Sequence, residues 1–213
     1  KEIVSLPKHL KNNGYTTISN GKIYHFLDDN WEDWDEVWRP YAFEGPKEIK
    51  PIDWWESLWK DYQTNENKNL ENLTGKGPAF EKAVVDDSVL IDGLLTNKVI
   101  RDIKRLKNES SPFFLTAGFI SNHLPFIAPK RFWDMYDYES IKLPKNDSPP
   151  VNSPSISISN NSELVNGYLG IPKKGDLSED LSKKLKHGYY STVSYVDHLV
   201  GKIIITLEEE ELL

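Results

Sequence analysis

The sequence predicts an α/β fold, with a mostly parallel sheet flanked by helices, because of three neighbouring segments. Residues 111–119 begin as a near-continuous apolar run, which is typical of a strand buried on both faces. Residues 88–107 carry apolar side chains at helical spacing, and the short break 108–112 joins the two segments. A helix, a short loop and a buried strand in this order form the unit from which parallel sheets are built.

The length and composition are those of a globular protein. The chain has 213 residues, enough for one large domain or two small ones, and 38% of them are hydrophobic and 12% aromatic. No apolar run approaches the ~20 residues that cross a bilayer, so we expect no membrane partner. The first five residues do not form a signal peptide, and we expect any export signal to lie outside these residues.

The charge and the cysteine count exclude several classes of function. There is no cysteine, which excludes disulfides, thiolate zinc sites and cysteine nucleophiles within these residues. The net charge of -7 argues against general nucleic-acid binding, which favours basic surfaces. An acidic protein can still bind an anion if it concentrates its positive groups in one cleft.

The first predicted element is a short amphipathic helix over residues 4–13. Ser5 is placed to cap its N-terminus, Pro7 lies in its first turn, and Gly14 can end it. The β-branched residues 15–19 that follow predict a strand, which completes a second helix–strand unit.

Polar side chains follow both predicted strands at the point where each ends. The turn Asn20-Gly21 leads into Lys22 and His25, and the apolar run of residues 111–119 leads into His123. In an open parallel sheet, ligands bind outside the carboxyl ends of the strands. These side chains are therefore the first candidates for a functional site.

Residues 26–82 form a Trp-rich region that we interpret as a variable insertion. Its tryptophans alternate with acids, and several have the spacing of a helical stripe. We favour packing under a loop-rich segment, and the alternative is that one or two Trp faces stack on sugar rings. Residues 63–82 are polar and Asn-rich, which predicts a surface loop. The six tryptophans are Trp31, Trp34, Trp38, Trp54, Trp55 and Trp59.

The second half of the chain contains two further predicted helices around an irregular excursion. A short helix is expected to start near Pro129. Residues 137–175 are rich in Pro, Ser and Asn and lack periodicity; excursions of this size are usually functional or mobile. Ser178 then caps a long helix with an apolar stripe, which ends in a run of glutamates at residues 208–211.

Four motifs, in this order along the chain, resemble the type I sulfatase family, and most of all its iduronate-2-sulfatase-like branch. Each motif is weakly specific by itself, and their order makes the resemblance strong. The motifs are Leu6–Thr17, Gly21-Lys22-Ile23-Tyr24-His25, the segment Pro112–Trp133 with His123-Leu124-Pro125-Phe126, and Tyr189–Asp197 followed by Gly201-Lys202.

The resemblance implies an alkaline-phosphatase-like α/β fold and hydrolysis of sulfate esters, usually on carbohydrates. Residues 1–213 would then be part of a sulfatase catalytic domain, with 26–82 and 137–175 as its variable segments. The family also implies a sulfated carbohydrate as partner and a periplasmic, secreted or lysosome-like location.

The resemblance also assigns roles to individual residues. Lys22 would contact the sulfate oxygens, His25 would lie beside the nucleophile, and His123 would reach the sulfate or the leaving oxygen. Fixed cations stabilise the negative charge that shifts to the bridging oxygen, and a histidine can protonate that oxygen. Lys130 and Arg131 would line the path of the anionic substrate, or else form a solvated first helical turn.

The chain also departs from the family pattern. The family's nucleophile is a formylglycine made from Cys or Ser in a Cys/Ser-x-Pro-x-Arg motif, and Ser5-Leu6-Pro7-Lys8-His9 lacks the Arg. The paired Asp residues that the family uses for Ca²⁺ are missing too. We therefore expect the formylglycine and the calcium ligands to lie outside these residues, which would be an internal segment and inactive alone.

Two alternatives to the sulfatase remain open. The same scaffold could hydrolyse phosphate or phosphonate esters. The chain could instead belong to a non-catalytic protein that binds an acidic glycan through the Trp-rich region. A Cys/Ser-x-Pro-x-Arg motif in the complete open reading frame would favour the enzyme, whereas the exact substrate and the oligomeric state are not specified by these residues.

Overall fold

The computed structural model describes residues 3–25, 30–40, 58–146, 148–157 and 162–213. The chain forms two compact units, the first from residues 1–61, 85–121 and 194–213, and the second from residues 62–84 and 122–193. The long helix α7 (Glu179–Glu209) contributes its N-terminal half to the second unit and its C-terminal part to the first.

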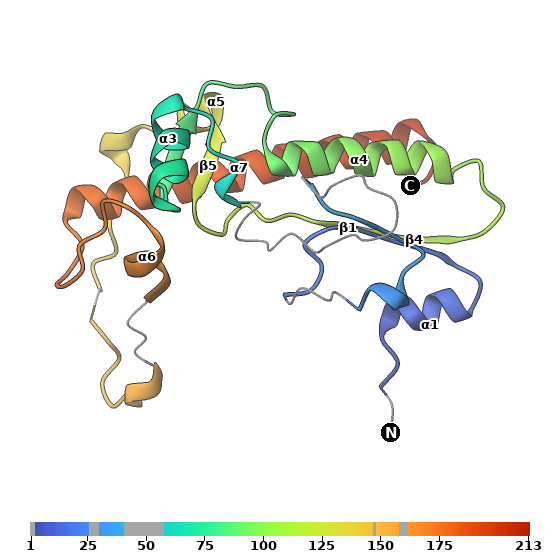
Figure 1. Ribbon diagram of the computed structural model, residues 1–213, viewed down its shortest axis with the longest axis horizontal. Helices are drawn as coiled ribbons and strands as arrows, with labels where there is room; N and C mark the ends of the chain where they lie inside the picture. The colour runs from blue at the N-terminus through green and yellow to red at the C-terminus, as the bar shows by residue number, and fades with distance from the viewer. Residues whose placement is uncertain (1–2, 26–29, 41–57, 147, 158–161) are drawn as a thin grey trace. The chain divides into compact units, whose positions relative to one another are not determined.

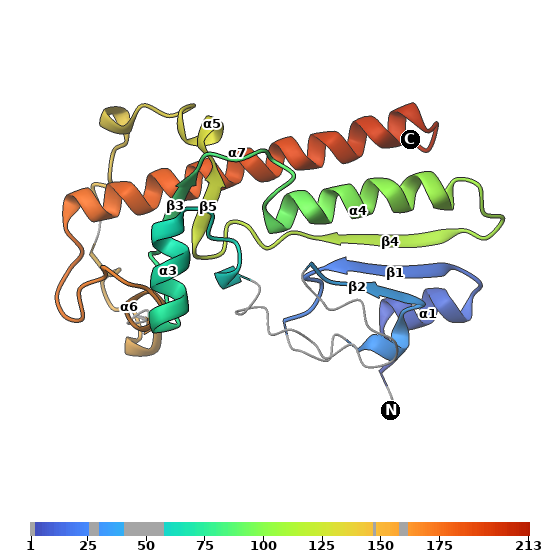
Figure 2. The ribbon, with the colours of Figure 1, turned by 45° about the horizontal axis from the view of Figure 1, so that its top comes forward.

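A three-stranded parallel sheet is the centre of the first unit. Strand β1 (Thr16–Gly21) lies between β2 (Glu36–Trp38) and β4 (Phe113–Gly118), and both pairings are parallel. The sheet is seen in Figures 1 and 2. The predicted parallel α/β arrangement is confirmed, and the strand expected in residues 111–119 is β4. The expectation that this strand is buried on both faces is wrong, because all six of its residues are only partly buried.

Helices cover both faces of this sheet. Figure 2 shows α4 (Ile91–Leu106) along one face and α1 (Leu6–Asn12) on the other. Buried side chains of α4 at helical spacing form the core against the sheet, as the apolar periodicity predicts. These side chains are Leu95, Val99 and Ile103, and the residues packed on them are Trp38, Leu115, Ala117, Phe119, Ile203 and Leu207.

Helix α1 has the predicted N-cap. The Oγ of Ser5 accepts a hydrogen bond from the backbone N–H of Lys8 over 3.3 Å, and Pro7 lies in the first turn. Gly14 follows the helix with a φ of +85°, a conformation that favours glycine. This local sequence therefore fixes where the chain turns into β1.

The expected turn at Asn20-Gly21 is wrong. Both residues belong to β1, because the pairing with β4 continues to the register Gly21↔Gly118. Gly21 has a φ of +74°, and a Cβ there would lie 2.3 Å from the carbonyl oxygen of Gly118. Glycine is thus needed for the close approach of the two strands and not for a hairpin.

The second unit contains a two-stranded parallel sheet. Strand β3 (Phe80–Ala83) pairs with β5 (Phe126–Pro129), and α5 (Lys130–Trp133) follows β5 directly. The prediction of a surface loop over residues 63–82 is wrong, because this stretch holds α3 (Asn65–Thr74) and most of β3. The remaining short elements are η2 (Tyr138–Ser140), η3 (Ser155–Ser157) and α6 (Ser162–Gly167).

Trp31, Trp34 and Trp38 do not form the predicted helical stripe. Trp31 begins the short 3₁₀ helix η1 (Trp31–Asp33), and Trp38 ends β2. Trp34 is buried and stacks on Phe114 of β4, with 5.8 Å between ring centroids. Packing, which we favoured over sugar stacking, accounts for this side chain. Trp54 and Trp55 lie outside the described residues.

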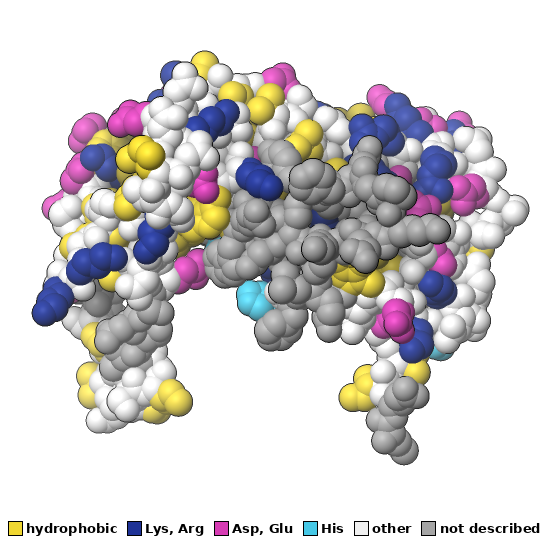
Figure 3. All heavy atoms as spheres, viewed as in Figure 1, with side chains coloured by type: hydrophobic (Ala, Val, Ile, Leu, Met, Phe, Trp, Pro, Cys, Tyr) yellow, Lys and Arg dark blue, Asp and Glu magenta, His cyan; other side chains and the backbone are white. Residues whose placement is uncertain are grey.

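Charges of both signs are interspersed on the described surface that Figure 3 presents. None of the helices within the described ranges is both long and apolar enough to cross a membrane.

Replacing Ile103 by Ala should lower the free energy of unfolding by about 2–5 kcal/mol, because Ile103 is 1% exposed and its loss leaves a cavity under α4. Ile204, on α7, is 45% exposed, and its replacement by Ala should change stability by less than about 0.5 kcal/mol. Urea unfolding of both variants measures the difference. Equal urea midpoints for the Ile103→Ala and Ile204→Ala variants would contradict the assignment of Ile103 to the core.

Candidate active site

Lys22 and His25 follow β1 at its carboxyl end. The backbone N–H of Lys22 donates to the carbonyl oxygen of Gly118 over 2.8 Å, which extends the pairing of β1 and β4 by one residue. A Cβ on Gly118 would lie 2.1 Å from the carbonyl oxygen of Lys22, so the two backbones touch here. Lys22 is therefore fixed at the edge where ligands of parallel sheets bind, and His25 lies exposed three residues further on.

Lys22 is half-buried. Among the described residues, no acidic side chain forms an ion pair with it. Most other described lysines of this unit do have such partners, for example Lys11 with Asp35 at 3.2 Å. Lys22 thus combines a position at the carboxyl end of β1 with the lack of an acidic partner among the described residues.

The backbone after β4 is held by a buried carboxylate that the sequence analysis missed. Asp92, in the first turn of α4, is 1% exposed and accepts the backbone N–H groups of Ile120 at 2.9 Å and Ser121 at 2.7 Å. Burial raises the pKa of Asp92, and these hydrogen bonds oppose that rise. An acid inside the first turn of an amphipathic helix, followed by Gly93, was the available sequence signal.

His123 belongs to the second unit and lies three residues before β5. Its Nδ1 is 2.7 Å from the carbonyl oxygen of Leu124, and its Nε2 is 3.3 Å from Oε1 of Glu163 on α6. Glu163 comes from the excursion 137–175 and was not among the predicted site residues. The side chain of His123 is 37% exposed and is therefore partly accessible to solvent.

Lys130 is the first residue of α5 and forms an ion pair with Asp134 one turn later. Asp134 also pairs with Lys82 of β3 at 2.7 Å, and hydrogen bonds from the two lysines hold the pKa of its carboxyl low. The geometry is that of a partly exposed helical turn. A substrate-lining role of Lys130 stays a prediction.

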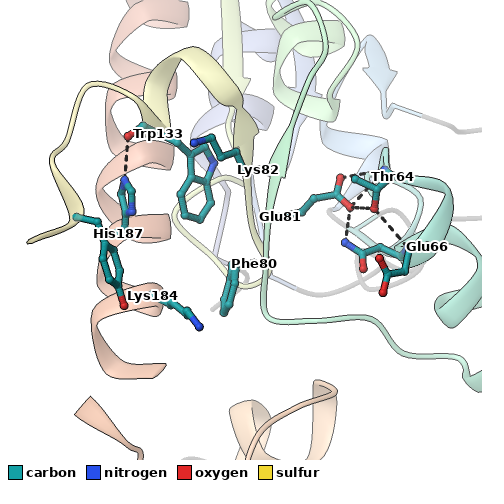
Figure 4. Close-up of a pocket in the computed structure, with 10 residues that line it drawn as sticks. Thr64, Glu66, Phe80, Glu81, Lys82, Trp133, Lys184 and His187 are labelled. Carbon is teal, nitrogen blue, oxygen red and sulfur yellow. Dashed lines mark hydrogen bonds between the residues drawn. The ribbon is translucent and has the colours of Figure 1, made fainter. Parts of the chain in front are cut away.

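A cavity of about 480 Å³ opens in the second unit, within the size range of ligand pockets. Figure 4 shows Trp133 facing Phe80 on one side and His187 on the other, with Lys184 near the rim. The Nε2 of His187 is 2.8 Å from the carbonyl oxygen of Trp133. The lining residues are Thr64, Glu66, Asn67, Phe80, Glu81, Lys82, Trp133, Tyr138, Lys184 and His187.

Calcium, which the family resemblance implies, does not fit the described residues. Calcium takes six to eight oxygen ligands, chiefly from carboxylates. Nowhere in the described ranges do three or more His, Asp or Glu side chains gather closely enough to hold a metal ion.

The sequence pattern of the family described as Sulfatase matches residues 1–213. The chain belongs to the sulfatase family. Its fold is therefore the alkaline-phosphatase-like α/β fold of sulfatases, in agreement with the parallel sheets and flanking helices. The four ordered motifs are thus a genuine family signal.

Several curated sulfatases are similar to this chain over nearly its whole length. Iduronate 2-sulfatase of Mus musculus is 28% identical over 96% of the chain and 37% of that protein. Choline-sulfatase of Rhizobium meliloti is 26% identical over 96% of the chain and 39% of that protein. A sulfatase of Formosa agariphila is 26% identical over 98% of the chain and 39% of that protein. The chain thus spans less than two-fifths of the length of these relatives.

Replacing Asp92 by Asn should lower the free energy of unfolding by about 1–3 kcal/mol, because an amide NH₂ would face a buried backbone N–H that now has an acceptor. Asp180→Asn is the matched control, since the side chain of Asp180 is 62% exposed. Thermal or urea unfolding gives both values. An Asp92→Asn variant as stable as the control would show that these hydrogen bonds are dispensable.

Proposed function

We propose that this protein hydrolyses sulfate esters of carbohydrates. The observation that carries the proposal is Lys22, a cation with no acidic partner among the described residues, fixed at the carboxyl end of the central strand. It stands in a chain of the sulfatase family, whose relatives are named for sulfate-ester substrates.

Each predicted site residue has a role in this proposal. Lys22 binds the sulfate oxygens and stabilises the charge that develops on them. His25 lies beside the nucleophile. When the S–O bond breaks, its electron pair passes to the bridging oxygen, which takes a proton from His123 and leaves as an alcohol. Water supplies the hydroxyl that stays with sulfur and the proton that restores His123.

The cavity of the second unit has a lining that suits a carbohydrate ligand. Its aromatic walls at Phe80 and Trp133 offer apolar faces, and Asn67, Glu66 and Lys184 offer hydrogen-bonding groups. Ligand pockets commonly combine apolar surface with a few polar groups that fix orientation. Lys130 would line the approach of the anionic substrate.

Calcium and a formylglycine nucleophile would come from residues other than the described ones. The family resemblance supports a periplasmic, secreted or lysosome-like location for such an enzyme.

Sulfate release from a panel of sulfated glycans tests the proposal, with the protein expressed from its complete open reading frame. Phosphate and phosphonate esters serve as comparison substrates. Faster turnover of sulfated glycans than of the phosphate and phosphonate esters would support the proposed function. Preferential turnover of the comparison esters, or glycan binding without any turnover, would overturn it in favour of one of the two alternatives.

Lys22→Ala and His123→Ala should each lower kcat/KM by at least about 10²-fold, the scale of losing one preorganised donor. The exposed Lys174 serves as the control, and Lys174→Ala should leave kcat/KM unchanged. Initial rates of sulfate release measure all three. A rate near that of the unaltered protein would remove the substituted residue from the site.

Lys184→Ala should raise KM for a sulfated oligosaccharide about two- to fivefold, the scale of one exposed charge pair, and leave KM for a small aryl sulfate unchanged. Lys183 lies one residue away on α7 and does not line the cavity, so Lys183→Ala is the matched control. Equal KM values for the two variants would exclude the cavity as a sugar site.

A further inference from the structure

His123 and Glu163 form a contact in which both ring nitrogens of the histidine face oxygen atoms. The Nδ1 atom lies 2.7 Å from the carbonyl oxygen of Leu124, and the Nε2 atom lies 3.3 Å from Oε1 of Glu163. A carbonyl oxygen can only accept, so Nδ1 carries a hydrogen. The other nitrogen is left to meet the carboxylate.

The helix that carries Glu163 is anchored in place. The ammonium groups of Lys173 and Lys76 donate to the carbonyl oxygens of Val165 and Asn166, at 2.6 and 2.5 Å. These ammonium groups supply hydrogen bonds to carbonyl oxygens that have no partner within the short helix α6, because they lie at its C-terminal end. Just beyond, the backbone N–H of Leu169 donates to the carbonyl oxygen of Gly77 over 2.9 Å. Glu163 thus reaches His123 from a fixed position.

The carboxylate oxygen at this contact is shielded from water. Oε1 of Glu163 is buried, although the side chain as a whole is 40% exposed. Burial, and after it the charge of Glu163, raises the pKa of the nearby Tyr168, which stays neutral. The contact has the distance of an ion pair without the alignment of a hydrogen bond. A shielded carboxylate oxygen is costly unless its charge is compensated, and His123 is the partner in reach.

The two facing atoms require one proton between them. With Nδ1 donating to Leu124, a neutral ring would present the lone pair of Nε2 to the lone pairs of Oε1. That arrangement is repulsive, whereas a single proton on Nε2 makes the contact attractive. The 3.3 Å contact between Nε2 and Oε1 is therefore most favourable with a hydrogen on Nε2.

We propose that Glu163 is a positioning residue that keeps a proton on Nε2 of His123 for delivery to the leaving oxygen of the sulfate ester. The inference rests on the proposed function and adds a residue to it. As the S–O bond breaks and its electron pair moves to the bridging oxygen, that oxygen takes the Nε2 proton. Neutral His123 is left beside the carboxylate, and a proton from water restores the pair.

Glu163→Gln tests the inference, because glutamine keeps the shape of the side chain and removes its charge. An alkyl sulfate such as a sugar sulfate needs its leaving oxygen protonated, whereas the stable leaving group of 4-nitrophenyl sulfate does not. We expect kcat/KM to fall at least about tenfold for the sugar sulfate and to change less than about threefold for the aryl sulfate, since general acid catalysis contributes about 10²–10⁴-fold. Glu179→Gln, at a side chain 75% exposed, should change neither.

Equal losses for both substrates, or no loss for either, would overturn the inference, because a purely structural role of Glu163 predicts no dependence on the leaving group. A second measurement is independent of turnover: the ¹⁵N signals of labelled histidine, with His123 identified by its absence in His123→Gln. We expect a protonated Nε2 in the unaltered protein and a larger unprotonated fraction in Glu163→Gln at the same pH. Unchanged signals would overturn the inference alone, whereas no sulfate release by the unaltered protein would overturn the proposed function and the delivery step with it.

Discussion

The first unit depends on one backbone contact, the approach of β1 to β4 at Gly21 and Gly118. Each glycine lies where a Cβ would come within 2.3 Å of the other strand or of Lys22. Any side chain at either position would force the two strand ends apart, and the hydrogen bond from Lys22 to Gly118 would break. The position of Lys22 is therefore a consequence of strand pairing, since its backbone belongs to the same ladder.

Elements with long apolar periodicity could be predicted from the sequence, and short polar ones could not. Helices α4 and α7 and strand β4 carry patterns that few other structures would produce. Strand β3 has four residues, and its buried Glu81 is polar, so nothing in its composition indicated a strand. That carboxylate accepts the backbone N–H of Gln63 at 2.6 Å and the hydroxyl of Thr64 at 2.8 Å. Burial here depends on partners that only the fold brings together.

The same distinction applies to the candidate site. Lys22, His25 and His123 could be found because each follows a predicted strand, a property of the local sequence. The contacts of Asp92 and Glu163 could not be found in this way, because each acts on a residue 28 to 40 positions away in the chain. Periodicity and motifs indicate local structure, and they do not show which residues far apart in the chain come into contact. The supporting carboxylates of a site are thus harder to find from a sequence than its cations.

These carboxylates also bear on the proposed anion site of a chain whose net charge is -7. The carboxylates of Asp92 and Glu81 are buried and accept hydrogen bonds from backbone N–H groups. The carboxylate of Glu163 faces His123. Their negative charge is therefore compensated within the fold before it can oppose a sulfate. Lys22, by contrast, has no acidic partner among the described residues, so its field is available to a ligand. For the proposed anion site, the charges that are compensated inside the fold matter more than the net charge does.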